Sequence, residues 1–431
     1  MMGKKTTEKK NLDVAIIGGG PAGISAGLEL SRQKGLNVAL LERENQLGGI
    51  PRSCHFFFGM RDQKRLYTGP VYARKLERLI RNTPIEIQTG ATVLNIFPGN
   101  SGDLHRLEVL SPEGLRSYES RFILLATGCC ESSRHKRMIP GTRPAGIFTT
   151  GTLQQLVNLD GLLFRGKRAV VVGSEHVALS SVLTLKRAGA AVAALIEEDR
   201  ELHTYPLIAA AIKSTCRFPI YRDTAIDAIL GEERVEGVSL FTRKTRRRFQ
   251  LPCDLVVITG KFQPESSLID NTPIARDPAT SGPLVAMDLS TSTANIFAAG
   301  NVLRGADMHD FCALEGRLAA RSILRQTRFE KSEAPNWVSL KAEPPIRHVV
   351  PQKISSKKLP MAYSRCLFPT AAFQVGVTLK NSVVEASSAT RHLWRGSYRK
   401  LIADNRYRLP MEKFKWHRLD PSAGIVLRMR A

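Results

Sequence analysis

A glycine-rich turn between two apolar runs constrains this chain more than any other feature. Residues 14–17 are apolar, the motif Gly18-x-Gly20-x-x-Gly23 follows, and helical apolar spacing then leads to a second apolar run that ends in Glu42. This order predicts a strand, a tight turn, a helix and a second parallel strand. In such a unit the first glycine permits the turn and the second lets the backbone approach a pyrophosphate, while the third allows close helix packing. We therefore predict a dinucleotide site at this turn.

The residues expected to hold the dinucleotide follow from the same geometry. Pro21 and Ala22 open the helix, whose N-terminus offers free N–H groups and a positive dipole to phosphate. Glu42, 19 residues after Gly23, is placed to accept hydrogen bonds from ribose hydroxyls, and Arg43 follows it. Together with the three motif glycines, these residues form the predicted cofactor-binding set at the first turn.

A similar pattern recurs later in the chain. Strand-like residues 169–173 and 191–197 flank helical spacing over 177–188, and a hairpin is expected at 237–248. The run Leu255–Gly260 ends like the earlier run 122–128, and three short strand-like runs between 85 and 125 suggest a small meander. These signals predict an α/β fold with two Rossmann-like dinucleotide-binding domains.

The last hundred residues have a different texture. Prolines break the chain at 335, 344, 345 and 351, and short strand-like stretches follow at 373–379, 407–409 and 425–429. The net charge of the whole chain is +24, and residues 331–431 contribute 19 Lys/Arg against 6 Asp/Glu. We predict a small, basic, β-rich C-terminal module.

The second glycine turn is altered at its critical position. In Gly173-Ser-Glu175-His-Val-Ala178 a glutamate stands where the second glycine should be. Its side chain adds bulk, and its charge opposes a diphosphate by about 1 to 4 kcal/mol. Glu197 could still accept from a ribose, but we expect this turn to bind NAD(P) poorly and the domain to serve as a scaffold or a partner interface.

The Gly18 motif, the strand end Ala126-Thr127-Gly128 and the segment Ile296-Phe-Ala-Ala-Gly300 resemble the glutathione reductase type of two-dinucleotide-domain flavoproteins over residues 11–328. The resemblance implies an FAD domain in two parts (11–145 and 261–328), a second NAD(P)-type domain (146–260) and the added module (329–431). It also implies that Gly49, Ala126, Thr127, Gly128, Gly300 and Asn301 contact FAD. Asn301 replaces the aspartate usual in the family, and its amide can still bond a ribityl hydroxyl.

The stretch Gly48-Gly49-Ile-Pro-Arg52-Ser-Cys-His55, with Gly69-Pro-Val-Tyr72, resembles more narrowly a subgroup with opine oxidase, hydrogen cyanide synthase and dye-linked proline dehydrogenase subunits. That resemblance implies oxidation of a small amino or imino acid, or a related carboxylated molecule, with electrons passed to another acceptor or subunit. Arg52 is the candidate carboxylate clamp and His55 the candidate base, with Tyr72 and His309 next. Each has a structural alternative: Arg52 could bind pyrophosphate, His55 could be structural and Tyr72 could belong to the core.

The seven cysteines show no redox or metal-binding spacing. None forms a C-x-x-C pair, so no metal site and no disulfide-exchange pair is predicted. Cys129 and Cys130 are expected to be reduced. Cys312 falls in the first turn of a predicted helix; we expect it to pack as a small apolar residue, with a thiolate near the flavin as the alternative.

Composition limits the partners and the location. No apolar run reaches the length of a membrane span, and the basic first ten residues do not resemble a signal peptide, so we expect a cytoplasmic protein. Basic clusters without a nucleic-acid motif favour an acidic partner subunit or an anionic membrane surface over DNA or RNA. Two alternatives stay open beside the dehydrogenase or oxidase hypothesis: an NAD(P)H-dependent flavin reductase and a non-catalytic flavoprotein scaffold.

Overall fold

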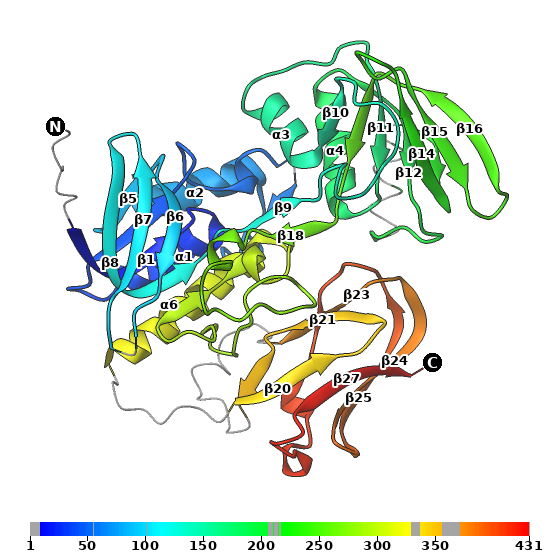
Figure 1. The fold of residues 1–431 in the computed structure, drawn as a ribbon. Coiled ribbons are helices and arrows are strands. Elements are labelled where there is room, and N and C mark those ends of the chain that lie inside the picture. Colours follow the sequence, from blue (N-terminus) through cyan, green and yellow to red (C-terminus); the bar gives the residue numbers. More distant parts are fainter. Residues whose placement is uncertain are drawn as a thin grey trace.

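A computed structural model describes residues 9–430, apart from 55, 101, 206–209, 211–213, 215–216, 329–336 and 356–370. Its first α/β unit is built on a sheet of order β5-β2-β1-β8-β7-β6, with β19 paired to the end of β8 (Figure 1). The strands are β1 (Lys9–Ile17), β2 (Val38–Glu42), β5 (Glu86–Thr89), β6 (Thr92–Phe97), β7 (His105–Ser111), β8 (Gly114–Leu125) and β19 (Ile296–Ala298). Strands β5, β2, β1, β8 and β19 are parallel, whereas β6 and β7 form an antiparallel meander with β8.

Three helices accompany this sheet: α1 (Pro21–Leu30), α2 (Gly69–Arg81) and α6 (His309–Arg328). α1 packs closely on α6, since a Cβ at Gly316 would lie 2.0 Å from the carbonyl oxygen of Ala22. Before α2 lie a one-turn helix η1 (Ile50–Arg52) and the short hairpin β3 (Phe57–Phe58) and β4 (Tyr67–Thr68). The apolar runs of the sheet are fully buried, which explains why they are continuous rather than alternating.

The second α/β unit repeats the plan. Its parallel sheet has the order β10-β17-β11-β12-β13 and carries α3 (Thr150–Asn158) and α4 (His176–Arg187). The strands are β10 (Ile147–Thr149), β11 (Arg168–Val172), β12 (Ala191–Ile196), β13 (Ile220–Tyr221) and β17 (Leu255–Ile258), and β14 (Thr224–Leu230), β15 (Gly237–Thr242) and β16 (Arg247–Pro252) add a meander. The chain passes between the two units through β9 (Cys129–Glu131) and β18 (Phe262–Pro264), which pair antiparallel.

Beyond α6 the described chain forms a β-rich module with its own core. One sheet has the order β22-β20-β27-β24-β25 and a smaller one the order β21-β23-β26. The strands are β20 (Trp337–Ala342), β21 (Ile346–Val350), β22 (Lys353–Ser355), β23 (Ala372–Val375), β24 (Leu379–Ser388), β25 (Arg391–Leu401), β26 (Tyr407–Arg408) and β27 (Ile425–Arg430). Short 3-10 turns are η2 (Ser267–Ile269), η3 (Gly300–Leu303), η4 (Met411–Lys413) and η5 (Trp416–Arg418). The predicted fold class is confirmed.

The C-terminal module contacts both α/β units. Arg406 donates to Asp307 over 2.7 Å and to Glu315 over 3.1 Å in the first unit, and Arg304 pairs with the same two carboxylates. All four side chains are nearly buried. The two guanidinium groups lower the pKa of Asp307 to about 2, although burial alone would raise it. The module is therefore fixed to the start of α6 by a buried cluster of four charges.

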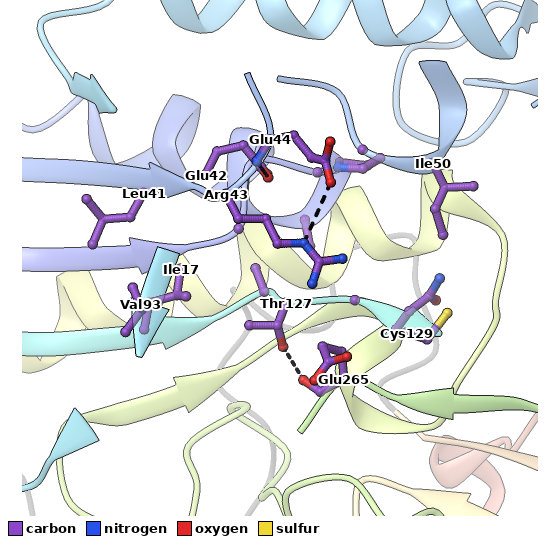
Figure 2. Close-up of a pocket in the computed structure, with 18 of the residues that line it drawn as sticks. Ile17, Leu41, Glu42, Arg43, Glu44, Ile50, Val93, Thr127, Cys129 and Glu265 are labelled. Atoms are coloured by element: carbon purple, nitrogen blue, oxygen red, sulfur yellow. Dashed lines mark hydrogen bonds and ion pairs between the residues drawn. The ribbon is translucent and has the colours of Figure 1, made fainter. Parts of the chain in front are cut away.

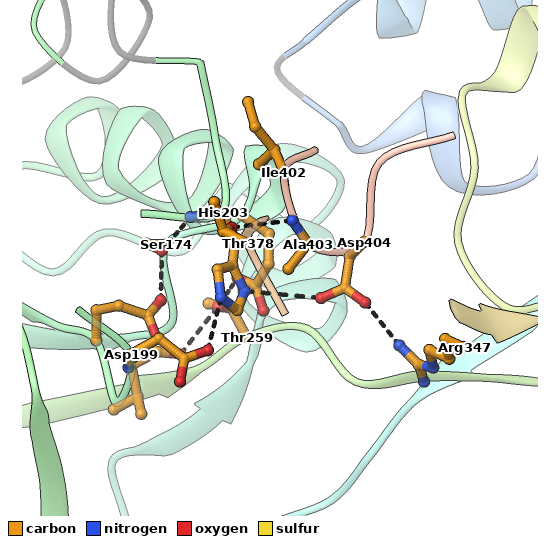
Figure 3. Close-up of polar contacts among 12 residues, drawn as sticks. Ser174, Asp199, His203, Thr259, Arg347, Thr378, Ile402, Ala403 and Asp404 are labelled. Carbon is orange, nitrogen blue, oxygen red and sulfur yellow. Dashed lines mark hydrogen bonds and ion pairs between the residues drawn. The ribbon is translucent and has the colours of Figure 1, made fainter. Parts of the chain in front are cut away.

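A second polar network joins the module to the second unit (Figure 3). His203 contacts Asp199 at 2.8 Å and Asp404 of the module at 3.7 Å, and Asp404 in turn accepts from Arg347 at 2.6 Å. Glu201 pairs with Lys380 and Lys400 of the module. Acidic groups that include Asp404 and Glu197 raise the pKa of His203 against the effect of burial.

Local boundaries differ from the sequence expectations in a few places. The first helix begins at Pro21 and ends at Leu30, because the glycine turn leads directly into it and the segment 31–37 forms the return to β2. The last long helix begins at His309, slightly earlier than expected. The module has eight described strands, whereas only three were expected, since β24 and β25 lack strong apolar alternation.

Candidate functional site

A cavity of about 460 Å³ lies at the carboxyl ends of β1, β2 and β8, where the first glycine turn is placed (Figure 2). Most of the predicted cofactor-binding residues line it: Gly18, Gly20, Pro21, Ala22, Glu42, Arg43, Gly49, Ala126, Thr127, Gly128 and Asn301. Gly23 and Gly300 do not line it and instead pack beneath it. The parallel strands explain this convergence, because their carboxyl ends meet at one edge of the sheet.

The three motif glycines have different surroundings. A Cβ at Gly18 would lie 2.4 Å from the carbonyl oxygen of Ala126, and one at Gly23 would lie 1.9 Å from that of Gly18. Nothing in the chain lies within 4 Å of a Cβ at Gly20. Gly18 and Gly23 are therefore needed by the fold itself, whereas Gly20 leaves an open space at the N-terminus of α1.

Glu42 closes one end of the cavity. Its carboxylate accepts from the N–H of Gly19 at 2.6 Å and from that of Glu44 at 2.8 Å, so the acid that ends β2 is held by the turn. Arg43 extends along the wall, and its Nε lies 3.8 Å from Glu44 (Figure 2). Each oxygen of Glu42 keeps a lone pair, which suits a hydroxyl donor such as ribose.

The other end of the cavity lies at the start of α6. Asn301 is buried, and its Oδ1 accepts from the N–H of Asp307 at 2.9 Å and from the Cys312 thiol at 3.1 Å. Its amide also hydrogen-bonds Cys129. Burial raises the pKa of both cysteines, because in this desolvated position the helix dipole does not compensate for the lost hydration of a thiolate. Cys312 is therefore a neutral packing residue, and the thiolate alternative is wrong.

His309 is the first residue of α6 and lines the cavity. Its ring packs edge-on against Phe58 with centroids 4.6 Å apart, and its side chain is nearly buried. Burial lowers the pKa of His309 to about 4, although Asp307 opposes this effect. The imidazole is thus neutral at pH 7 and has a free lone pair for a proton.

The other three candidate catalytic residues have different positions. Arg52 lines the cavity; its Nη1 donates to the carbonyl of Gln46 at 2.8 Å, and its buried Nε has no partner. Tyr72 does not line the cavity: it is fully buried in α2, and its hydroxyl donates to Asp62 at 2.9 Å. Its position matches the core alternative. His55 lies outside the described residues.

Sequence reasoning missed several lining residues because they come from distant segments. The backbone of Glu265 enters the wall after β18, and its carbonyl accepts from the Thr127 hydroxyl at 2.6 Å (Figure 2). Gln155 and Leu159 reach the cavity from the α3 segment of the second unit. No local motif marks these positions. Only the strand end Thr127-Gly128, which the sequence did identify, pointed to the place where they meet.

The second glycine turn is closed by its own side chain. A Cβ at Gly260 would lie 1.6 Å from Oε1 of Glu175, and Oε2 of the same residue accepts from Thr259 at 2.8 Å. Gly173 lies on the other side of this carboxylate. Burial raises the pKa of Glu175 to about 7. The positions of Gly18, Gly20 and Thr127-Gly128 in the first unit correspond to those of Gly173, Glu175 and Thr259-Gly260, so Glu175 fills the space that Gly20 leaves open.

Both turns retain the acid that follows the second strand. Glu197 accepts from Ser174 and from the N–H of Asp199, as Glu42 accepts from Gly19 and Glu44. Glu197, Asp199 and His203 are the group of described residues that could converge on a metal ion. The hydrogen bonds and ion pairs of these residues already account for the cluster.

The comparisons with known proteins agree with this geometry. The family model of the pyridine nucleotide-disulphide oxidoreductases matches residues 12–321. The chain belongs to this family. It is therefore an oxidoreductase-type flavoprotein of the FAD-binding kind, as the resemblance predicted. None of the helices in the described part of the chain is long and apolar enough to cross a membrane.

Individual relatives of this family member are distant. The large flavoprotein component of alkyl hydroperoxide reductase from Pseudomonas putida is 25% identical over 308 residues, which cover 69% of this chain and 55% of that protein. The chain thus spans about half the length of that relative. The hydrogen cyanide synthase protein HcnB of Pseudomonas aeruginosa is 32% identical over 167 residues, covering 37% of this chain and 31% of that one.

Solved structures of the family share the fold. Thioredoxin reductase of T. acidophilum has a TM-score of 0.62 and 20% identity, covering 74% of this chain and 99% of that one. L-proline dehydrogenase of P. horikoshii has a TM-score of 0.54 and 19% identity, covering 77% of this chain and 58% of that one. The predicted resemblance to the wider family and to the narrower subgroup is confirmed.

The residues around the cavity suit the family's cofactor. The space above Gly20 and the N-terminus of α1 offers room and N–H donors for a pyrophosphate, and the unpartnered Nε of Arg52 suits an anionic group. Glu42 faces the position of a ribose. We therefore assign this cavity as the site that would hold FAD.

Proposed function

We propose that the protein is an FAD-dependent dehydrogenase or oxidase that oxidises a small amino or imino acid, or a related carboxylated molecule. The observation that carries the proposal is the contrast between the two glycine turns: the first is open at Gly20, and the second is filled by Glu175. A flavoprotein of this fold that does not accept NAD(P)H needs another electron donor. The narrower subgroup resemblance supplies the class of that donor.

Two side chains along the cavity suit such a substrate. Arg52 offers a buried, unpartnered N–H that can bind the substrate carboxylate. His309 is neutral near pH 7 and can take the proton from the substrate nitrogen. Bound FAD supplies the hydride acceptor of this chemistry. Cys129, Cys312 and Phe58 at this end of the cavity keep water away from the reacting groups.

The proposal also covers the setting of the enzyme. All five cysteines in the described part of the chain are free, which fits the reducing cytoplasm. Electrons would leave the site to another acceptor or subunit. The substrate is expected to be a small molecule, and nucleic acid is not an expected partner.

The direct test is an anaerobic absorbance titration of the purified FAD-loaded protein with a panel of amino and imino acids. We expect one class of compound to bleach the oxidised-flavin band. Arg52→Met should raise the KM for that compound at least tenfold. His309→Gln should lower kcat more than it changes KM. If no carboxylated compound bleaches the flavin, the proposed function is wrong.

A further inference from the structure

The segment that leads from the cavity into α2 carries an unusual share of the exposed apolar surface. Of the 17 exposed large hydrophobic side chains in the described part of the chain, six fall between residues 50 and 79. The same segment, residues 50–81, has eight Lys/Arg and two Asp/Glu. We call the surface of this segment the basic apolar face; its apolar members are Phe57, Met60, Leu66 and Val71, and its free basic members are Lys64, Arg65 and Arg74.

These residues form one continuous piece of structure. Phe57 pairs with Thr68 across the β3–β4 hairpin, and β4 runs directly into α2, where Val71 lies in the first turn. Arg65 lies over the ring of Tyr67, and Lys75 donates to the Tyr67 hydroxyl at 2.7 Å. The hairpin and the helix are therefore held together, and the face is a fixed surface rather than a set of separate side chains.

The negative charges nearby are already neutralised. Asp62 is buried and accepts from Tyr72, and Glu77 pairs with Arg81 at 2.7 Å. No ion pair within the described part of the chain engages Lys64, Arg65 or Arg74. The face thus combines apolar contact area with positive charge that lacks a partner.

The face borders the cofactor cavity. Ile50 and Arg52 of η1 line the cavity, and the start of α2 is pressed against the same turn: a Cβ at Gly69 would lie 2.6 Å from the carbonyl of Pro51. A protein that docks here would sit one turn of chain away from the cavity wall.

We propose that the basic apolar face is the docking surface for an acidic electron-carrier protein. An apolar centre framed by unpaired positive charge complements an apolar centre framed by carboxylates. A second copy of this chain is disfavoured, because a two-fold interface would bring the positive segment against itself. A lipid bilayer is disfavoured because the four apolar side chains are only 41–53% exposed and lie along the surface instead of projecting from it. The inference deepens the proposed function by describing its electron acceptor.

The experiment measures binding, so it does not depend on the substrate. The oxidised, FAD-loaded protein is titrated with an acidic ferredoxin and an acidic flavodoxin by interferometry between about 20 and 300 mM salt, a range chosen to span strong and weak screening. We expect micromolar affinity at low salt that falls steeply with salt. The triple variant Lys64→Glu, Arg65→Glu, Arg74→Glu should bind at least tenfold more weakly and lose most of the salt dependence.

A matched control has the same change of charge elsewhere. Lys244→Glu, Arg246→Glu, Arg247→Glu alters the exposed hairpin of the second unit and should leave the affinity within twofold. Phe57→Ser should weaken binding without changing the salt dependence. Absence of salt-dependent binding to both carriers would overturn the proposal. So would binding to phosphatidylserine vesicles, or self-association in the ultracentrifuge, that the triple variant abolishes. The substrate titration described above separates a failure of this proposal from a failure of the proposed function.

Discussion

At the scale of single residues, the two glycine turns form an internal control. They share the strand before the turn, the helix after it and the acid beyond the second strand, and they differ where Gly20 is replaced by Glu175. Sequence spacing identified this difference. The spacing did not indicate that the carboxylate would fold inward onto Thr259 and Gly260, because this depends on a contact with a strand end 84 residues away.

Glu175→Gly is expected to open the second turn. Removing the carboxylate frees the space between Gly173 and Gly260 and removes a charge that opposes a diphosphate. We expect NADPH to bind the variant at least tenfold more tightly than the original protein, as measured by calorimetry. Glu175→Gln, which removes the charge but keeps the bulk, should bind no better than the original. Equal affinity of all three proteins would show that Glu175 does not control the site.

Gly20→Val is expected to remove FAD while sparing the fold. Gly20 has φ −81°, which other residues adopt readily, and its Cβ would point into open space. The purified variant should lack the flavin absorbance band, with a Tm within about 2 °C of the apoprotein. Gly23→Ala is the contrasting variant, since its Cβ would clash with the Gly18 carbonyl and should lower the Tm of the apoprotein. Retention of FAD by Gly20→Val would contradict the assignment of the cavity.

At the scale of elements, the start of α6 connects the site to the C-terminal module. Asp307 and Glu315 balance Arg304 and Arg406, and the N–H of Asp307 donates to Asn301 in the cavity wall. The sequence predicted the helix and the role of Asn301 in the site. It could not predict that an arginine 99 residues beyond Asp307 completes the cluster, because the pairing depends on how the module folds.

Arg406→Met is expected to destabilise the protein by about 3 kcal/mol, because two buried carboxylates would lose a partner. The measurement is the free energy of unfolding in urea. Arg428→Met is the matched control in the same module: its pair with Glu343 is exposed, so it should cost under about 0.5 kcal/mol. Equal effects of the two substitutions would show that the buried cluster does not hold the module in place.

At the scale of the whole molecule, two buried histidines link stability to pH. Burial lowers the pKa of His309 to about 4 and that of His348 to about 3, whereas an unfolded histidine titrates near 6.5. The unfolded chain therefore binds more protons between pH 6.5 and pH 4, and stability is lost as the pH falls through this range. His309→Gln should flatten the curve near pH 5 by about 1 kcal/mol per pH unit. An unchanged slope in urea unfolding at several pH values would show that His309 is not buried as neutral imidazole.

The general architecture was accessible from sequence because glycine turns, continuous apolar strands and strand-end motifs are local. Residues 38–42 were predicted as a strand and form β2 over the same residues. The part that could not be predicted is what lies between the units: Gln155 in the cavity wall, Asp404 beside His203, and the strands β24 and β25 of the module. These features depend on long-range packing, for which a single sequence carries no periodic signal.

The central claim is that the first dinucleotide site is functional and the second is closed. The most direct test is anaerobic rapid mixing of the FAD-loaded protein with NADH or NADPH, followed by a small amino or imino acid, while the oxidised-flavin absorbance is recorded. We predict that neither nucleotide bleaches the flavin within minutes and that the acid does. Rapid bleaching by either nucleotide would contradict the claim and would make the protein a pyridine-nucleotide-driven reductase.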